Sequence, residues 1–131
     1  MRGRFIFLID EPVIKTASYL EDYQEDERLL FLSVPPDHDQ AAILVMNDPL
    51  SALDDIKARV TEGFLVRTRA DADTVEARAG DYSRMRAAFD SGAHFISTDF
   101  YVPDERLESD YRVRFPEGGY ARQSPRFEVI D

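Results

Sequence analysis

The sequence predicts an α/β domain with a parallel sheet. Short apolar runs rich in β-branched and aromatic residues alternate with segments whose apolar residues recur at helical spacing. Strands that are apolar throughout are typical of parallel sheets buried on both faces. The chain of 131 residues is long enough for one domain and too short for two. No linker or repeat divides it, so we expect a single domain.

Each predicted element rests on a local pattern. The apolar runs predict strands over residues 5–9, 29–34, 42–46, 64–71 and 94–100. Helical spacing predicts helices over 13–23, 49–61 and 81–91. The second helix is expected to start with Asp48 as its N-cap and Pro49 in its first turn. Strand and helix units therefore fill residues 1–100, and an extended tail occupies 101–131.

Composition narrows the classes of function. There are 16 Lys+Arg and 26 Asp+Glu, which gives a net charge of -10 and disfavours binding to nucleic acid or to an anionic membrane. The absence of cysteine excludes disulfides, thiolate zinc sites and thiol nucleophiles. No apolar run approaches the ~20 residues of a membrane span, and no signal peptide precedes the first strand. We expect an acidic, soluble chain without a transmembrane segment.

Acidic residues mark the ends of the predicted strands. In parallel α/β folds the carboxyl ends of the strands line the functional face, and carboxylates there are suitable ligands for Mg²⁺ or Ca²⁺. The alternative is that each aspartate caps the helix that follows it. Capping is favoured for Asp48, whereas both interpretations stay open for Asp10. The residues concerned are Asp10, Asp48, Asp71 and Asp99.

The predicted strand 64–71 carries two arginines. Alternation places Arg67, Arg69 and Asp71 on one face, opposite an apolar face. Arginines are costly to bury without a partner. One interpretation is a clamp for a phosphate or another anion. The other is an internal ion-pair network of the two arginines with Asp71 and Asp99.

Recognisable catalytic motifs are missing from the sequence. His38 lies in a polar loop, and His94 precedes the last strand, at the amino-terminal end of the sheet, so the two cannot form an acid–base pair. The sequence has no nucleophile elbow, glycine-rich phosphate loop or dinucleotide fingerprint. We therefore assign no catalytic residue.

Three segments carry a resemblance to a known family. Residues 64–78 (FLVRTRADADTVEAR), together with 91–99 (SGAHFISTD) and 46–49 (MNDP), resemble the bacterial calcium-dependent phosphoinositide phospholipase C family. This family is related to the glycerophosphodiester phosphodiesterase-like TIM barrels. The opening residues 2–10 look like its fourth barrel strand, and residues 116–122 look like its terminal Gly-Gly segment.

The resemblance implies the C-terminal half of a TIM (β/α)8 barrel, about strands four to eight, since a complete barrel takes ~250 residues. In the family, the catalytic histidines and most calcium ligands belong to the first three strands. Asp10 matches an acidic position of the calcium site, so calcium is the expected cofactor of the complete barrel. The resemblance also implies a set of substrate-binding residues, namely Arg67, Arg69, Asp71, Ser97 and Asp99.

Three functions remain open at this point. The first is half of a phospholipase C-like phosphodiesterase that cleaves phosphoinositides or other phosphodiesters and is inactive alone. The second is a non-catalytic half-barrel that self-associates through open sheet edges as a binding or structural module. The third is a standalone enzyme that uses its aspartates and arginines. The expected partner is a second copy or a missing N-terminal half, and family members are typically secreted.

Overall fold

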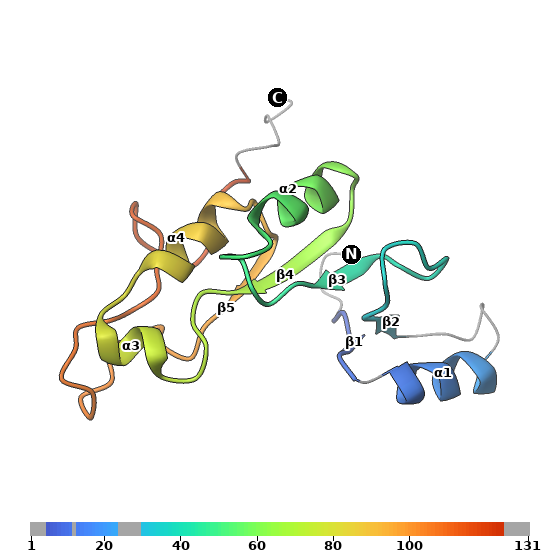
Figure 1. Cartoon of the computed structure of the whole chain (residues 1–131), viewed down its shortest axis with the longest axis horizontal. Coiled ribbons are helices and arrows are strands. Elements are labelled where there is room, and N and C mark those ends of the chain that lie inside the picture. Colours follow the sequence, from blue (N-terminus) through green and yellow to red (C-terminus); the bar gives the residue numbers. More distant parts are fainter. Residues whose placement is uncertain (1–4, 12, 24–29, 125–131) are drawn as a thin grey trace.

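The computed structural model describes residues 5–11, 13–23 and 30–124 (Figure 1). Strands and short helices alternate along the chain, as the sequence predicts. Within these ranges the elements are β1 (Leu8–Ile9), α1 (Val13–Asp22), β2 (Phe31–Leu32), β3 (Ile43–Val45), α2 (Leu53–Thr61), β4 (Leu65–Arg69), α3 (Val75–Ala79), α4 (Ser83–Asp90) and β5 (Phe95–Ser97). No helix in this part of the chain is long and apolar enough to cross a bilayer.

The strands pair in parallel and in sequence order. β1 pairs with β2, and β3, β4 and β5 form a three-stranded sheet with β4 in the middle. A parallel bridge from Leu32 to Ala41 links the end of β2 to the segment that leads into β3. The predicted α/β class with parallel strands is therefore confirmed. Within each of the two sheets, consecutive strands of the sequence therefore lie side by side.

The two faces of β4 differ because its residues alternate. Val66 and Thr68 are fully buried, and Val66 packs into a cluster with Ile56 and Val60 of α2. Both α2 and α4 pack against β4. The intervening residues Leu65, Arg67 and Arg69 are only half-buried and lie on the other face. The helices thus cover one side of this sheet and leave the arginine side partly open.

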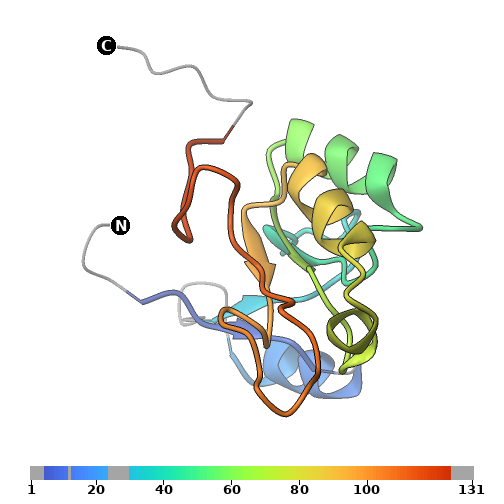
Figure 2. The ribbon, with the colours of Figure 1, turned by 90° about the vertical axis from the view of Figure 1, so that its left-hand side faces the viewer.

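The tail folds back beside α4 and β5, although it has no helix or strand between 98 and 124 (Figures 1 and 2). Tyr111 is its anchor, with 1% of its surface exposed. Its ring stacks on Tyr82 at 4.8 Å and meets Phe100 edge-on at 5.8 Å. The Tyr111 hydroxyl donates to the carbonyl oxygen of Ala70 at 3.1 Å, next to the end of β4. The tail therefore completes the core on this side of the molecule.

Helix α2 begins later than predicted. It starts at Leu53, and residues 49–52 form turns. The N-cap is Ala52, with no side-chain capping bond, so the expected capping role of Asp48 is wrong. The Asp48 carboxylate instead accepts a hydrogen bond from the Ser51 hydroxyl at 2.7 Å and another from Arg84 at 2.9 Å. The carboxylate thus bonds the turn that precedes α2 and Arg84 of α4, and it does not cap α2.

Other boundaries also differ from the sequence pattern. Within the described residues, the predicted strands 5–9, 29–34, 42–46, 64–71 and 94–100 shorten to β1, β2, β3, β4 and β5. Residue 29 lies outside those residues. Helix α3 is absent from the sequence-based prediction. It ends at Gly80, whose φ of +62° is the left-handed conformation that glycine adopts readily at helix ends.

We expect Tyr111→Phe to lower the free energy of unfolding by about 1–2 kcal/mol, because the carbonyl of Ala70 loses a buried donor. Urea denaturation measures this loss. Tyr120→Phe is the matched control, since the exposed Tyr120 hydroxyl donates to the Tyr101 carbonyl, where water can replace it. Equal losses in the two variants would show that the bond to Ala70 does not anchor the tail.

Candidate functional site

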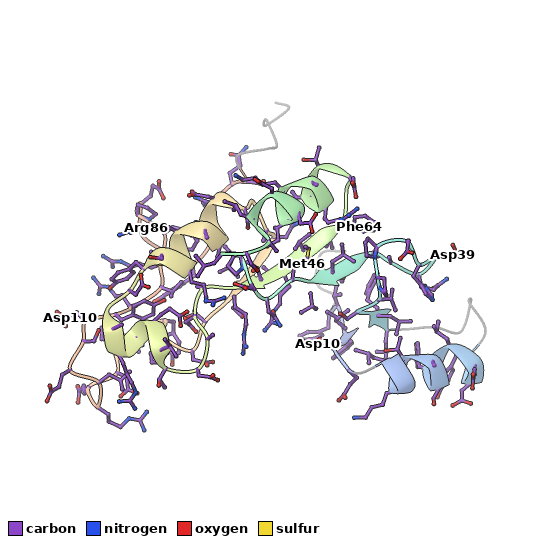
Figure 3. The ribbon with its side chains drawn as sticks, in the orientation of Figure 1. Asp10, Asp39, Met46, Phe64, Arg86 and Asp110 are labelled. Carbon is purple, nitrogen blue, oxygen red and sulfur yellow. The ribbon has the colours of Figure 1, made fainter. Side chains whose placement is uncertain are left out.

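Arg67, in the middle of β4, reaches residues that follow two other strands. Its Nη1 atom donates to Oδ1 of Asn47, which follows β3, at 2.6 Å. The same nitrogen lies 4.0 Å from Oδ2 of Asp10, which follows β1. Figure 3 labels Asp10 and Met46, which mark the two strand ends. The structure therefore brings one predicted metal ligand and one predicted substrate-binding residue together.

Arg69 lies one strand repeat beyond Arg67 on the same face. In register across the sheet, Arg67 pairs with Phe95 and Arg69 pairs with Ser97, so these four residues share the face opposite the helices. The guanidinium of Arg69 has no hydrogen bond or ion pair to any of the residues described. Of the two arginines, Arg67 is thus held by the protein while Arg69 keeps its donors available for an anion.

Asp71 connects the ends of β4 and β5. Only 3% of its surface is exposed, and its carboxylate accepts hydrogen bonds from the Thr98 hydroxyl and, at 3.2 Å, from the Asp99 amide. The proposed ion-pair network of Arg67 and Arg69 with Asp71 and Asp99 is wrong, because neither aspartate forms an ion pair with either arginine. Hydroxyl and amide donors satisfy Asp71, so it needs no arginine.

The two remaining predicted substrate residues lie at the end of β5. The Ser97 hydroxyl donates to the carbonyl oxygen of Thr68 at 3.2 Å, while the Asp99 side chain is exposed. Asp99 is therefore free to face a ligand from the rim of the sheet. To contact a ligand, the Ser97 hydroxyl would have to break its hydrogen bond to Thr68 or accept a hydrogen bond from the ligand.

A second ion-pair cluster was missed by sequence reasoning. Arg84 of α4 donates through Nε to Glu76 at 2.6 Å and through Nη1 to Asp48 at 2.9 Å. Glu76 also accepts from the amide of Ala72 at 2.9 Å. Burial raises the pKa of Glu76, but the Ala72 amide and the Arg84 guanidinium outweigh burial and hold that pKa below its usual value. This cluster ties the loop after β3 to α3 and α4.

The histidines lie away from the arginines. His94 is at the amino-terminal end of β5, where its Nδ1 accepts from the amide of Val66 at 3.3 Å. Burial lowers the pKa of His94. His38 lies on the loop before β3, and its Nδ1 accepts from the amide of Gln40 at 3.0 Å. Both positions agree with the prediction that the two histidines form no pair at the carboxyl face.

The described residues do not by themselves fit a calcium ion. Calcium takes six to eight oxygen ligands. In the part of the chain that the structure covers, no three acidic, histidine or cysteine side chains gather into a metal-binding group. The Asp10 carboxylate is 57% exposed and lies near the Arg67 cation. Asp10 can thus supply one calcium ligand.

We expect Arg84→Gln to lower the free energy of unfolding by about 1–3 kcal/mol at neutral pH, because it leaves the nearly buried Glu76 carboxylate without its cation. The folded pKa of Glu76 is depressed, so its contribution is present above the unfolded pKa of about 4.3 and is lost as pH falls through the folded value. In Arg84→Gln the folded pKa of Glu76 rises toward the unfolded value, so this contribution should be smaller and its loss should be complete at a higher pH.

Urea titrations between neutral pH and pH 3 measure both effects. Arg86→Gln, an exposed position on the same helix, is the matched control and should change stability little. If Arg84→Gln behaved like Arg86→Gln at every pH, the cluster would not stabilise these loops.

Comparison with known proteins agrees with the resemblance seen in the sequence. The family model described as phosphoinositide phospholipase C, Ca2+-dependent, matches residues 1–125. No curated protein and no solved structure matches the chain. The matched range includes β1 to β5 and each of the residues discussed above. The chain therefore belongs to the Ca²⁺-dependent phosphoinositide phospholipase C family.

Proposed function

We propose that the chain is the C-terminal half, about strands four to eight, of a TIM (β/α)8 barrel phosphodiesterase. Its substrate would be a phosphoinositide or a related phosphodiester, and the chain would be inactive alone. Parallel strands paired in sequence order are what consecutive barrel strands require. The face that carries Arg67 and Arg69 would line the barrel interior, because α2 and α4 cover the other face of β4.

The observation that carries this proposal is the pair of arginines in the middle and at the carboxyl end of β4. In TIM barrels the residues at these strand ends contact the substrate. Arg67 is already oriented by Asn47, so little side-chain entropy remains to be lost when it binds a phosphate. Arg69 has no partner within residues 5–124 as described, and it would supply further donors to the same anionic head group.

The remaining predicted site residues would have supporting roles. Asp99 and Ser97 would contact the hydroxyl groups of the head group from the end of β5. Asp71 would act by holding Thr98 and the backbone of Asp99 in place. Asp10 would be one calcium ligand of a complete barrel, in which the other ligands and the catalytic histidines come from the first three strands.

A non-catalytic half-barrel that self-associates is the second candidate. The observation in its favour is exposed aromatic surface: Phe5 is 89% exposed, Phe7 61% and Phe95 50%. Phe95 lies on the arginine face, in register with Arg67. Exposed aromatic residues beside open strand edges favour association with another chain.

The standalone enzyme has less support. Two of its four strand-end aspartates are engaged in structural bonds, Asp48 with Arg84 and Asp71 with Thr98.

Activity on phosphatidylinositol vesicles with calcium distinguishes the candidates. We expect no release of inositol phosphate by the chain alone. Release should appear on mixing with the strand-one-to-three half of a family enzyme, and Asp10→Ala should abolish it. Turnover by the chain alone, lost in Asp10→Ala, would contradict the proposal that it is incomplete. A stable homodimer by light scattering, with no turnover in any mixture, would support the self-associating module.

We expect Arg67→Gln and Arg69→Gln each to weaken binding of myo-inositol 1-phosphate about tenfold or more, since each removes a charge-assisted hydrogen bond to the phosphate. Isothermal titration calorimetry of the reconstituted barrel measures this. Arg112→Gln, an exposed arginine in the tail, is the control for net charge and should bind normally. Equal weakening in all three variants would point to bulk charge and not to a specific clamp.

A further inference from the structure

A pocket of about 320 Å³ lies between β5, the end of α4 and the tail. Ile96 and Thr98 line it from the β5 side, and they alternate with Phe95 and Ser97, which share the face of Arg67 and Arg69. The pocket is therefore on the opposite side of the sheet from the proposed substrate site. Figure 2 shows the tail, coloured orange to red, running beside β5.

The wall of this pocket is largely apolar. Phe89 comes from α4, and Val113 and Phe115 come from the tail. The rings of Phe89 and Phe115 lie 4.6 Å apart between centroids, which makes a continuous aromatic surface. A pocket of this size with such walls accommodates the hydrocarbon or aromatic body of a small molecule.

The charge of the lining is the reverse of the charge of the chain. Arg114 and Arg122 line the pocket together with His94, and no aspartate or glutamate is among the described lining residues. The chain as a whole has a net charge of -10. Two cations gathered without a carboxylate in an acidic protein favour an anionic ligand.

Arg122 is held in a geometry that suits a carboxylate. Its guanidinium lies over the ring of Phe115 at 4.6 Å and near that of Phe89 at 5.5 Å. Nη2 donates to the carbonyl oxygen of Phe89 at 2.7 Å. No carboxylate pairs with Arg122 in the described part of the chain. Ring contacts and one backbone bond thus orient the planar group, and its other N–H groups remain for a bidentate partner.

His94 adds a neutral donor to the lining. Its Nδ1 accepts the amide proton of Val66, so the ring proton is on Nε2. Burial lowers the pKa of this imidazole, which keeps it neutral near pH 7. It can donate a hydrogen bond to an anion without adding charge.

We propose that this pocket binds a small amphipathic carboxylate, with its apolar body against Phe89, Val113 and Phe115 and its carboxylate bound by Arg122 and Arg114. The positive charge of the lining, which is complementary to a carboxylate, is the observation that carries this inference. It goes beyond the proposed phosphodiesterase function and does not rest on it, because none of the strand-end residues at the carboxyl end of β4 takes part.

Isothermal titration calorimetry with the full chain tests the proposal, using decanoate as the probe below its micelle concentration. Decyltrimethylammonium, with the same alkyl chain and the opposite charge, is the comparison. We expect decanoate to bind one site at least tenfold more tightly than the cation does. Arg114→Gln and Arg122→Gln should each weaken decanoate binding about tenfold, the effect of losing one charge-assisted hydrogen bond.

Two controls separate this site from other effects. Arg112→Gln removes the same charge two residues from Arg114 but outside the lining, and it should bind decanoate normally. Arg67→Gln should also bind decanoate normally, whatever it does to inositol phosphate. Arg114 is exposed, and no hydrogen bond of its side chain supports the fold in the described residues, so Arg114→Gln keeps the test valid even if Arg122→Gln unfolds.

Three results would overturn the proposal. The first is equal affinity for decanoate and decyltrimethylammonium, which would indicate non-specific apolar binding. The second is unchanged decanoate affinity in Arg114→Gln. The third is no binding by a chain that light scattering shows to be a dimer, which would make the pocket an interface between two copies.

Discussion

The alternation of buried and half-buried side chains along β4 imposes the main constraint on this structure. As the middle strand of the sheet, it must pair on both sides, so neither its length nor its register is free to shift. One of its faces must be uncharged to pack under α2 and α4, and Val66 and Thr68 are fully buried there. The other face carries Arg67 and Arg69, whose desolvation is costly. That face must therefore remain in contact with water, an anion or a polar partner, which determines which side of the sheet can serve as a site.

Hydrogen bonds and ion pairs between residues far apart in the sequence hold together the segments at the carboxyl edge of the sheet. Arg67 bonds Asn47 across the strands, Arg84 bonds both Asp48 and Glu76, and Asp71 accepts from Thr98. The Arg84–Asp48 and Thr98–Asp71 bonds link segments that follow different strands, and the Arg67–Asn47 bond links β4 to the segment that follows β3. The loops are thus positioned by one another before any ligand arrives, and a site on them starts from a preorganised geometry.

Sequence patterns predicted the sheet better than they predicted its connections. The apolar runs located all five strands, because burial on a parallel sheet leaves a strong local pattern. The start of α2 was wrong because the Asp48 carboxylate is taken by Ser51 and Arg84, and Arg84 is 36 residues away. The five-residue helix α3 is too short to show a helical period.

The sequence proposes members of the candidate site but does not predict the contacts between them. The arginine-rich strand and the family motif identified Arg67 and Arg69, whereas the bond from Arg67 to Asn47 depends on the register of β3 with β4. The anchoring role of Tyr111 was missed because a tail without periodicity gives no indication of burial. Membership of a barrel and the roles of the site residues stay predictions, since both would depend on strands that the described residues do not include.

The bond between Tyr111 and Ala70 spans 41 residues of sequence, and this separation affects how the chain is made. Proteins emerge from the ribosome with the N-terminal part first. β4, α4 and β5 are therefore all synthesised before the segment that covers Ala70, Phe89 and Phe100. Until Leu107 and Tyr111 follow, this part of the core faces water. A nascent chain paused before Tyr111 is synthesised would expose this apolar surface, and exposed apolar surfaces are what chaperones bind.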